Sequence, residues 1–406
     1  MTRIRVLVVD DSVVIRRLVS DVLSGDPGIE VVGTAPNGKL ALAKLAQLAP
    51  DLLTMDIEMP EMDGIAAVRA MRASGSRLPV IMFSTLTERG ASATLDALEA
   101  GASDYVTKPA NVGSVAQSMD QVRRQLIPKI KALLPRGGTG TPGPVGTAAQ
   151  RQPGSPGSPG QPGPAAGRVP GVGSPAAGAA AARALGRPGP IETVPRAKRD
   201  APYRLLAIGC STGGPEALSR FLSGFPADLP VPVVVVQHMP PVFTRQFAGR
   251  LDRQHRVRVL EAAGGEVLEP GTVYIAPGDF HMELQGRGAA VVTRLQQGPP
   301  ENFCRPAVDV LFRSAATVYG GDVLGVVLTG MGADGRRGSE QLVSRGASVV
   351  VQDEPTSVVW GMPGAVAGAG LAEEVLPLDD LGPAVLQRLQ SHRGAGRVPA
   401  LSTRGV

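Results

Sequence analysis

The chain has 406 residues, two cysteines and a formal net charge of +5. This length allows two or three domains with full hydrophobic cores. Two cysteines exclude a disulfide framework and a cysteine-rich metal site. The apolar run at 6–9 is too short for a signal peptide, and Val233–Val236 is too short for a membrane span. We therefore expect a soluble, cytoplasmic protein with no membrane insertion.

The excess of positive charge lies in one unusual segment. Residues 137–190 contain four arginines and no acidic residue, so the rest of the chain carries a formal charge of only +1. A nucleic-acid groove needs a clustered basic face, which the remaining sequence lacks, and we expect no nucleic-acid binding. The same segment is rich in Gly, Pro, Ala and Ser and has no aromatic residue. Such a composition cannot form a core, so it predicts a flexible linker with a reach of roughly 40 Å.

Before this segment, short apolar runs alternate with stretches of helical periodicity. This pattern predicts a five-stranded parallel sheet covered by helices on both faces. The predicted strands are Arg5–Val9, Val31–Ala35, Leu52–Met55, Val80–Phe83 and Tyr105–Thr107. Predicted helices include Ile15–Leu23, Lys39–Leu48, Ile65–Met71 and Val115–Leu134, the last with a kink at Pro128.

After the segment the alternation returns and predicts a second, doubly wound and mostly parallel α/β domain. Its predicted strands are Leu205–Gly209, Val233–Gln237, Val257–Ala262, Thr272–Ala276, Leu324–Thr329 and Ser348–Gln352. Glycines in the middle of Met282–Leu295 predict an inserted β-hairpin, and the apolar spacing from Val308 to Tyr319 predicts a helix. The expected organisation is one domain at 1–125, a helix end and flexible linker at 126–200, a second domain at 201–392 and a disordered tail at 393–406.

Polar residues follow several strands of the first domain. Asp10 and Asp11 end the first strand, Asp56 the third, Ser84 the fourth and Lys108 the fifth. Because ligands of open α/β sheets bind at the carboxyl ends of the strands, these side chains are expected to converge. Three carboxylates at one edge favour a cation, and oxygen ligands suit Mg²⁺. A lysine and a hydroxyl beside them suit a phosphoryl group.

With VVDD at 8–11, MDIEMPEMDG at 55–64 and YVTKP at 105–109, residues 1–125 resemble a response-regulator receiver domain. The resemblance implies that Asp56 accepts a phosphoryl group from a histidine kinase. It implies that Asp10, Asp11, Asp56 and the backbone carbonyl of Glu58 hold Mg²⁺. It further implies that Ser84 and Lys108 contact the phosphoryl group, that Tyr105 is the aromatic switch, and that the Lys108–Pro109 bond is cis.

The first strand of the second domain ends in GCSTGG at 209–214, which has two interpretations. A small-residue turn can cradle a phosphate, but no lysine stands where a P-loop has one. The same turn can expose a serine nucleophile, Ser211. His238 and Asp334 follow two other strands of this sheet, so a base and an orienting acid would meet the serine. The order Ser, His, Asp disfavours the α/β-hydrolases.

The second domain resembles the catalytic domain of the CheB family of chemotaxis protein-glutamate methylesterases. The matching motifs are IGCSTGGPEAL at 208–218, QHMPPVFTRQFAGRL at 237–251 and LTGMGADG at 328–335. The resemblance implies that Ser211, His238 and Asp334 hydrolyse glutamyl methyl esters on methyl-accepting chemotaxis receptors. Backbone N–H groups near Met331 and after Thr212 would form the oxyanion hole. Glutamine deamidation is also implied, and the esterase would need no cofactor.

The resemblance implies that the receiver inhibits the esterase until Asp56 is phosphorylated. The segment at 137–190 is longer than the linkers usual in the family, which predicts weaker docking and higher basal activity. Two other functions remain open. The second domain could be a binding module without turnover, although an intact Ser211, His238 and Asp334 argue against it. The esterase could also act on proteins other than chemoreceptors.

Overall fold

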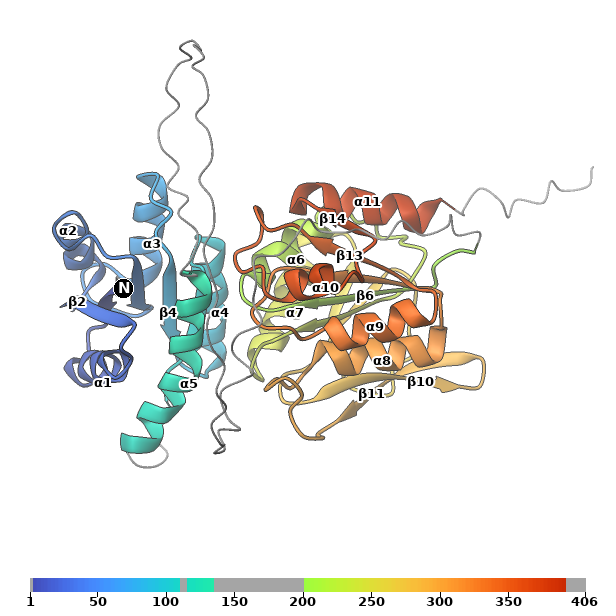
Figure 1. Cartoon of the computed structure of the whole chain (residues 1–406), viewed down its shortest axis with the longest axis horizontal. Helices are drawn as coiled ribbons and strands as arrows, with labels where there is room; N and C mark the ends of the chain where they lie inside the picture. Colours follow the sequence, from blue (N-terminus) through green and yellow to red (C-terminus); the bar gives the residue numbers. More distant parts are fainter. Residues whose placement is uncertain (1–2, 110–114, 135–200, 392–406) are drawn as a thin grey trace, which may run out of the picture. The chain divides into compact units, whose positions relative to one another are not determined.

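The computed structural model describes residues 3–109, 115–134 and 201–391 (Figure 1). The predicted linker at 137–190 and the predicted tail at 393–406 lie outside the described residues. The described residues form two α/β folds, one on each side of the gap in sequence.

The first fold is a five-stranded parallel sheet with strand order β2-β1-β3-β4-β5, as predicted. Each strand ends at the same edge, which collects the residues that follow β1, β3, β4 and β5. The strands are β1 (Ile4–Val9), β2 (Ile29–Ala35), β3 (Leu52–Asp56), β4 (Val80–Ser84) and β5 (Asp104–Thr107). The helices are α1 (Val13–Ser24), α2 (Gly38–Leu48), α3 (Gly64–Ala73), α4 (Glu88–Glu99) and α5 (Val115–Leu133).

Side-chain caps determine where four of these helices begin. Ser12, Asn37, Asp63 and Thr87 each accept a hydrogen bond from the backbone N–H three residues later. These N–H groups have no partner inside the helix, so each cap satisfies a donor that the helix leaves open. The caps therefore start each helix just beyond a strand end and leave a short loop for functional residues.

The second fold is a seven-stranded sheet whose pairs are all parallel, in the order β14-β13-β12-β6-β7-β9-β8. The predicted hairpin is also present as the antiparallel pair β10-β11. The strands are β6 (Leu205–Cys210), β7 (Val233–Gln237), β8 (Arg258–Glu261), β9 (Thr272–Ile275), β10 (His281–Arg287), β11 (Ala290–Gln296), β12 (Val323–Val327), β13 (Ser348–Gln352) and β14 (Glu374–Leu376). The helices are α6 (Gly214–Leu222), α7 (Phe243–Gln254), α8 (Val308–Tyr319), α9 (Arg336–Ser344), α10 (Met362–Gly368) and α11 (Leu378–Gln390).

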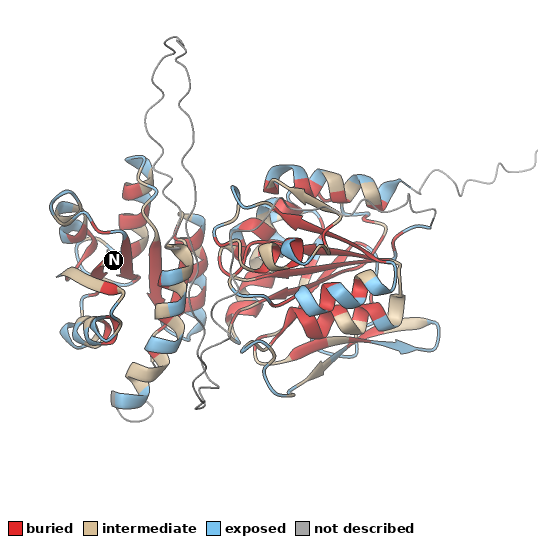
Figure 2. Cartoon of the chain, viewed as in Figure 1, coloured by how far each residue is buried: buried red, intermediate tan, exposed pale blue. Residues whose placement is uncertain are grey.

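Helices cover both faces of this sheet, because alternate residues of each strand join different cores. Leu206 and Ile208 of β6 pack in one buried cluster with residues of α6, α7 and α11. Leu205 and Ala207 pack on the opposite face in a second cluster with α8, α9 and α10. Figure 2 shows the resulting pattern of buried strands between helices that bury one side. The continuous apolar strands predicted from the sequence are therefore buried on both faces.

One local expectation was wrong. The Lys108–Pro109 bond is trans, and among the described residues the cis bond is Arg305–Pro306. A proline bond favours trans by about 0.5–1 kcal/mol unless tight packing selects cis. The helix α5 contains Pro128, as its predicted range required. The short strand β14 was not predicted, because it has only three residues.

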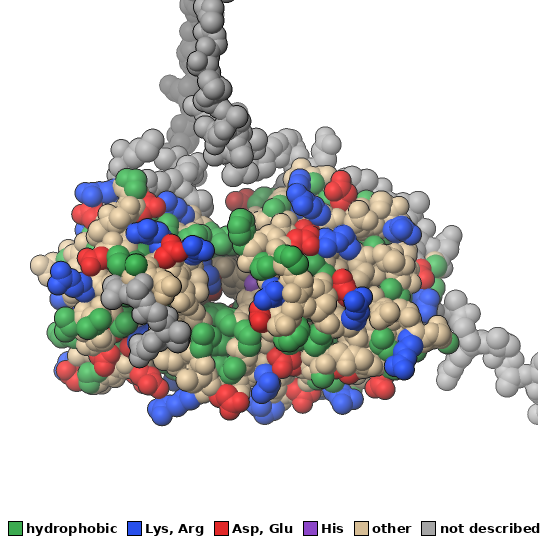
Figure 3. Space-filling view, turned by 90° about the horizontal axis from the view of Figure 1, so that it is seen from below, with side chains coloured by type: hydrophobic (Ala, Val, Ile, Leu, Met, Phe, Trp, Pro, Cys, Tyr) green, Lys and Arg blue, Asp and Glu red, His purple; other side chains and the backbone are tan. Residues whose placement is uncertain are grey.

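Within the described residues, no helix combines the length and apolar character that crossing a bilayer would require. On the face shown in Figure 3, lysine and arginine side chains lie among aspartate and glutamate side chains.

Candidate active site and phosphorylation pocket

Ser211 lies directly after β6, at the point where the strand order of the second sheet reverses. In the sheet, β6 lies between β12 and β7. Ser211 N donates to Thr329 O at 3.0 Å, which fixes the serine to the loop after β12. Gly213 has a φ of 75°, in the left-handed region that other residues rarely adopt, so this tight turn requires glycine. The turn therefore holds Ser211 at the carboxyl edge, where α/β folds bind ligands.

His238 and Asp334 meet at the same edge. His238 follows β7 and lies 2.8 Å from Asp334 Oδ2 through its Nε2 atom. The Asp334 carboxylate is buried and accepts hydrogen bonds on both oxygens from four further donors: Asn302 Nδ2 and the backbone N–H groups of Val308, Asp309 and Gly335. Because these donors come from three different segments, the carboxylate is rigidly aimed at the imidazole.

The loop between β11 and α8 supplies two contacts that sequence reasoning missed. Asn302 Nδ2 lies 2.9 Å from Asp334 Oδ1 and 2.9 Å from Asp309 Oδ2. Cys304 Sγ lies 3.5 Å from His238 Nδ1, on the side of the imidazole opposite Asp334. The motif NFCRPAVD at 302–309 was the available signal, but it contains no residue type that marks catalysis by itself.

The protonation of the imidazole depends on these neighbours. Burial alone would lower the pKa of His238, but the adjacent Cys304 sulfur and the Asp334 carboxylate outweigh burial and raise it above its ordinary value. Burial also opposes ionisation of Asp334, but the imidazole and the backbone donors outweigh it and lower the pKa of that carboxyl. The pair is therefore arranged to stabilise an imidazolium beside a carboxylate.

Ser211 and His238 follow neighbouring strands, β6 and β7, and their side chains are not hydrogen-bonded. Among the hydrogen bonds of residues 201–391, none joins Ser211 Oγ to His238. The backbone N–H groups of Thr212 and Met331 likewise donate to no acceptor in this part of the structure. Free N–H groups beside a serine are the donors that an oxyanion hole requires.

Removing the Cys304 sulfur should change the pH dependence of any reaction that uses His238 as a base. The sulfur favours the protonated imidazole, so Cys304→Ala should shift the acidic limb of the kcat/KM profile to lower pH. Cys304→Ser keeps a hydrogen-bond acceptor at this position. Its acidic limb should therefore lie between the limbs of the wild type and of Cys304→Ala. Ester hydrolysis measured across pH would check this, and an unmoved limb in Cys304→Ala would contradict it. Activity at the optimum should change by less than about tenfold, because the thiol takes no proton from the serine.

The first domain contains a pocket where the predicted carboxylates and lysine do converge. Lys108 Nζ lies 2.7 Å from Asp56 Oδ2 and 3.1 Å from Asp10 Oδ2. A cavity of about 250 Å³ is lined by Asp56, Lys108, Ser84 and the predicted ligand residues Asp11 and Glu58. A Cβ on Gly64 would lie only 2.0 Å from the Asp56 carbonyl oxygen, so the loop folds tightly beneath the acid.

The carboxylates fit a divalent cation. Asp10, Asp11 and Asp56 each offer an oxygen, and these atoms lie within 4.8 Å of one another. Burial, and then the neighbouring Asp10, raise the pKa of Asp56 to about 6. Asp10 Oδ2 is buried and, among the described residues, its partner is the Lys108 ammonium at 3.1 Å. A cation would offset the cost of burying these acids, because it favours the ionised form and accepts carboxylate oxygens as ligands.

The side chains of two other predicted site residues, Ser84 and Glu58, bond to groups other than Asp56. The Ser84 hydroxyl accepts from Thr94 Oγ1 at 2.6 Å and lies 3.0 Å from Gly90 O, so it must rotate to reach a group on Asp56. The side chain of Glu58 points to Arg89 at 3.3 Å, which is consistent with a role for its backbone carbonyl only.

Comparisons with known proteins identify the family of each fold. The family model described as CheB methylesterase matches residues 206–385, and the model of the response regulator receiver domain matches residues 6–120. A relative from Nocardioides sp., named protein-glutamate methylesterase/protein-glutamine glutaminase, is 60% identical over 393 residues, which is 97% of each chain. The chain belongs to the CheB family.

A second CheB relative of the same name, from Trichodesmium erythraeum, is 45% identical over 96% of this chain and 100% of its own length. The crystal structure of the Thermotoga maritima CheB methylesterase catalytic domain is 41% identical, covers 46% of this chain and 99% of its own, and has a TM-score of 0.45. The two family models and the two relatives confirm the family resemblance and the receiver-then-esterase order predicted from the sequence.

Proposed function

We propose that this chain is a phosphorylation-activated serine hydrolase that demethylates glutamate methyl esters on methyl-accepting chemotaxis receptors and releases methanol. We infer that it also deamidates receptor glutamines and that it acts in the cytoplasm. The observation that carries the proposal is the pairing of a partly buried His238 with a buried Asp334, at the sheet edge that also carries the serine turn after β6. The name of a relative that is 60% identical along 97% of both chains supports the same substrate.

In the proposed reaction, Ser211 Oγ attacks the ester carbonyl and passes its proton to His238. Nε2 of the imidazole is held by Asp334 at 2.8 Å, so Nδ1 is the nitrogen that would take the proton, and the serine hydroxyl would replace the Cys304 sulfur that now lies 3.5 Å from Nδ1. His238 then gives the proton to the departing methanol, which leaves an acyl-serine. Water, deprotonated by His238, attacks that ester, and Ser211 and a glutamate are formed. With glutamine as substrate, ammonia leaves instead of methanol.

The negative charge on the carbonyl oxygen needs donors that point at it. We take these donors to be the N–H groups of Thr212, on the turn of Ser211 itself, and of Met331, on the loop after β12, since neither donates to an acceptor within residues 201–391. Such preorganised donors each contribute on the order of 10²–10³ in rate.

In the receiver, the Asp56 carboxylate would attack the phosphorus of a kinase phosphohistidine. Asp10, Asp11, Asp56 and the Glu58 carbonyl would hold Mg²⁺, which would neutralise charge on the phosphoryl group. Lys108, now paired with Asp56, would pair with the new phosphoryl oxygens, and Ser84 would rotate toward them. The proposed receiver comprises residues 1–125 and the proposed esterase residues 201–392.

Inhibition by the receiver is supported by contacts beside the serine. Thr212 Oγ1 donates to Asp104 Oδ2 at 2.7 Å, one residue from Ser211. The proposed switch residue Tyr105 stacks on Phe243, the first residue of α7, with ring centroids 4.9 Å apart. A change in Tyr105 on phosphorylation would therefore disturb an element that begins five residues after His238.

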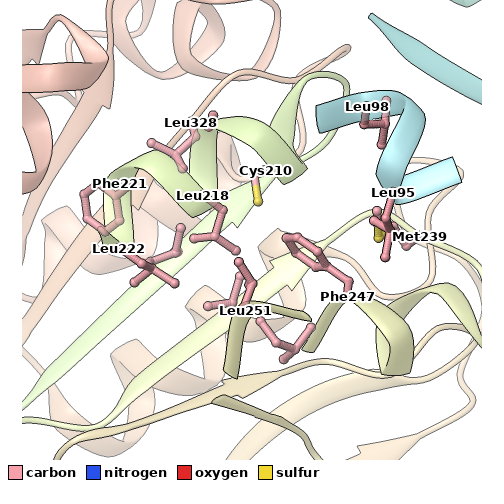
Figure 4. Close-up of a cluster of buried hydrophobic side chains, with 14 of the residues drawn as sticks. Leu95, Leu98, Cys210, Leu218, Phe221, Leu222, Met239, Phe247, Leu251 and Leu328 are labelled. Atoms are coloured by element: carbon pink, nitrogen blue, oxygen red, sulfur yellow. The ribbon is translucent and has the colours of Figure 1, made fainter. Parts of the chain in front are cut away.

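A polar and an apolar contact complete this interface. Arg250 of α7 pairs with Asp96 at 2.6 Å and also with Glu99, both on α4. Leu95 and Leu98 of α4 belong to the same buried cluster as Phe247 of α7 (Figure 4). Each 1.4 kcal/mol removed from such an interface increases the open fraction about tenfold.

The proposed function is tested by incubating the purified full-length chain with methylated chemoreceptor membranes and measuring released methanol. Release together with conversion of receptor ester to glutamate would support it. A folded protein that releases no methanol from these membranes would overturn it.

A further inference from the structure

The loop between β11 and α8 carries an exposed aromatic side chain, Phe303, between two residues that contact Asp334 and His238. Phe303 has an exposed fraction of 102%, so the folded chain covers none of it. It is the most exposed large apolar side chain among the described residues. A single exposed apolar residue is common on protein surfaces, so its backbone and neighbours must decide whether it has a role.

The backbone at this position is unfavourable for phenylalanine. Asn302 and Phe303 both lie in the left-handed region, with φ of 52° and 64°. Asparagine tolerates this region, whereas a bulky side chain is rarely found there. Phenylalanine at position 303 is therefore unfavourable in two respects: its backbone conformation and the exposure of its ring to water. Strained positions of this kind persist only where the surrounding structure enforces them, and they concentrate at functional sites.

Hydrogen bonds on both sides of Phe303 enforce the turn. Glu301 and Cys304 exchange backbone hydrogen bonds of 3.0 and 2.9 Å across it. The Glu301 carboxylate is held by both terminal nitrogens of Arg313, at 2.6 and 2.7 Å. Asn302 is bonded to Asp334 and Asp309. The loop is thus built rigidly onto the acid that orients His238.

The side chains along the turn point in opposite directions. Asn302 contacts Asp334 and Cys304 contacts His238, while the ring between them projects into water. Phe303 is therefore one residue from a contact to His238, on the outer surface of the loop that borders the candidate active site. Aromatic side chains are enriched at protein–protein interfaces, and the ones buried on binding are frequent anchors of binding energy.

We propose that Phe303 is an anchor for the substrate protein, contacting an apolar side chain on the receptor helix that carries the methylated glutamate. This inference rests on the proposed function and specifies how the same site selects its substrate. Side chains three or four positions apart lie on one face of a helix, about 5–6 Å apart. The partner we assign to Phe303 is an apolar residue on the same helix face as the glutamate, about one helical turn away.

The test compares a protein substrate with a small ester that is too short to contact Phe303 while it occupies the ester site. Phe303→Ala should lower kcat/KM for methanol release from receptor membranes about 30-fold. Hydrolysis of the methyl ester of an N-acetylated glutamate amide should be unchanged, since the ester site is intact. Phe303→Trp should restore most of the receptor activity. Thermal unfolding should not change, because the ring is wholly exposed.

Val267→Ala is the matched control, since Val267 is also exposed and apolar but pairs with the hairpin strand β11. It should leave both activities unchanged. Equal losses on both esters in Phe303→Ala would show a structural role and overturn the inference, as would full activity on receptor membranes. A wild-type chain that hydrolyses the small ester but not the receptor would overturn the proposed function, and this inference with it.

Discussion

Ser211→Ala is expected to lower methanol release from methylated receptor membranes by about 10⁴-fold or more. Removing the nucleophile of a serine–histidine–aspartate site leaves only the contribution of the oxyanion donors and of binding. The fold should be unaffected, because alanine keeps the Cβ and Ser211 Oγ makes no hydrogen bond within residues 201–391. Initial rates of release and thermal unfolding, measured on the same preparations, give both quantities.

Ser223→Ala is a suitable control for this change. Ser223 is an exposed serine of the same domain, and its hydroxyl bonds only to the Arg220 carbonyl at the end of α6. Its loss should leave the rate unchanged. A Ser211→Ala protein that keeps more than about a tenth of the wild-type rate would show that another group is the nucleophile.

Asp334→Asn is expected to affect both catalysis and stability. Both carboxylate oxygens accept hydrogen bonds: Oδ1 from Asn302 and two backbone N–H groups, Oδ2 from Val308 N and the imidazole. In either orientation the amide would place an N–H₂ group against donors. We expect a stability loss of about 2–4 kcal/mol and a rate loss of about 10³–10⁴.

The matched control is Asp379→Asn, at an exposed aspartate that pairs with Arg220 at the surface. Surface pairs contribute about 0–1 kcal/mol, so little change is expected. Chemical denaturation and ester hydrolysis measure the two effects. An Asp334→Asn variant with wild-type stability and rate would show that the carboxylate does not orient His238.

The sequence predicted the positions of residues that follow strands. Asp56 and Lys108 are 52 positions apart in the chain, yet their side chains lie 2.7 Å apart because parallel strands end at one edge. His238 and Asp334 meet for the same reason. In both domains, the apolar runs that define the strands are long enough to place these ends reliably.

Loop residues could not be placed in this way. Asn302 and Cys304 reach the site through the conformation of a turn with two left-handed residues, which periodicity does not report. The contact between Tyr105 and Phe243 could not be predicted from the sequence either. It joins two surfaces, and their complementarity depends on side-chain packing. The predicted cis bond at Pro109 came from family resemblance alone, and the structure has it in trans.

The central claim is that phosphorylation of Asp56 activates hydrolysis at Ser211. Its most direct test is methanol release from methylated receptor membranes by wild type and Asp56→Ala, each with and without a small-molecule phosphodonor and Mg²⁺. We predict release by both proteins, with a phosphodonor-dependent increase in wild type only. An equal increase in Asp56→Ala, or a wild-type rate that does not respond to the phosphodonor, would contradict the account.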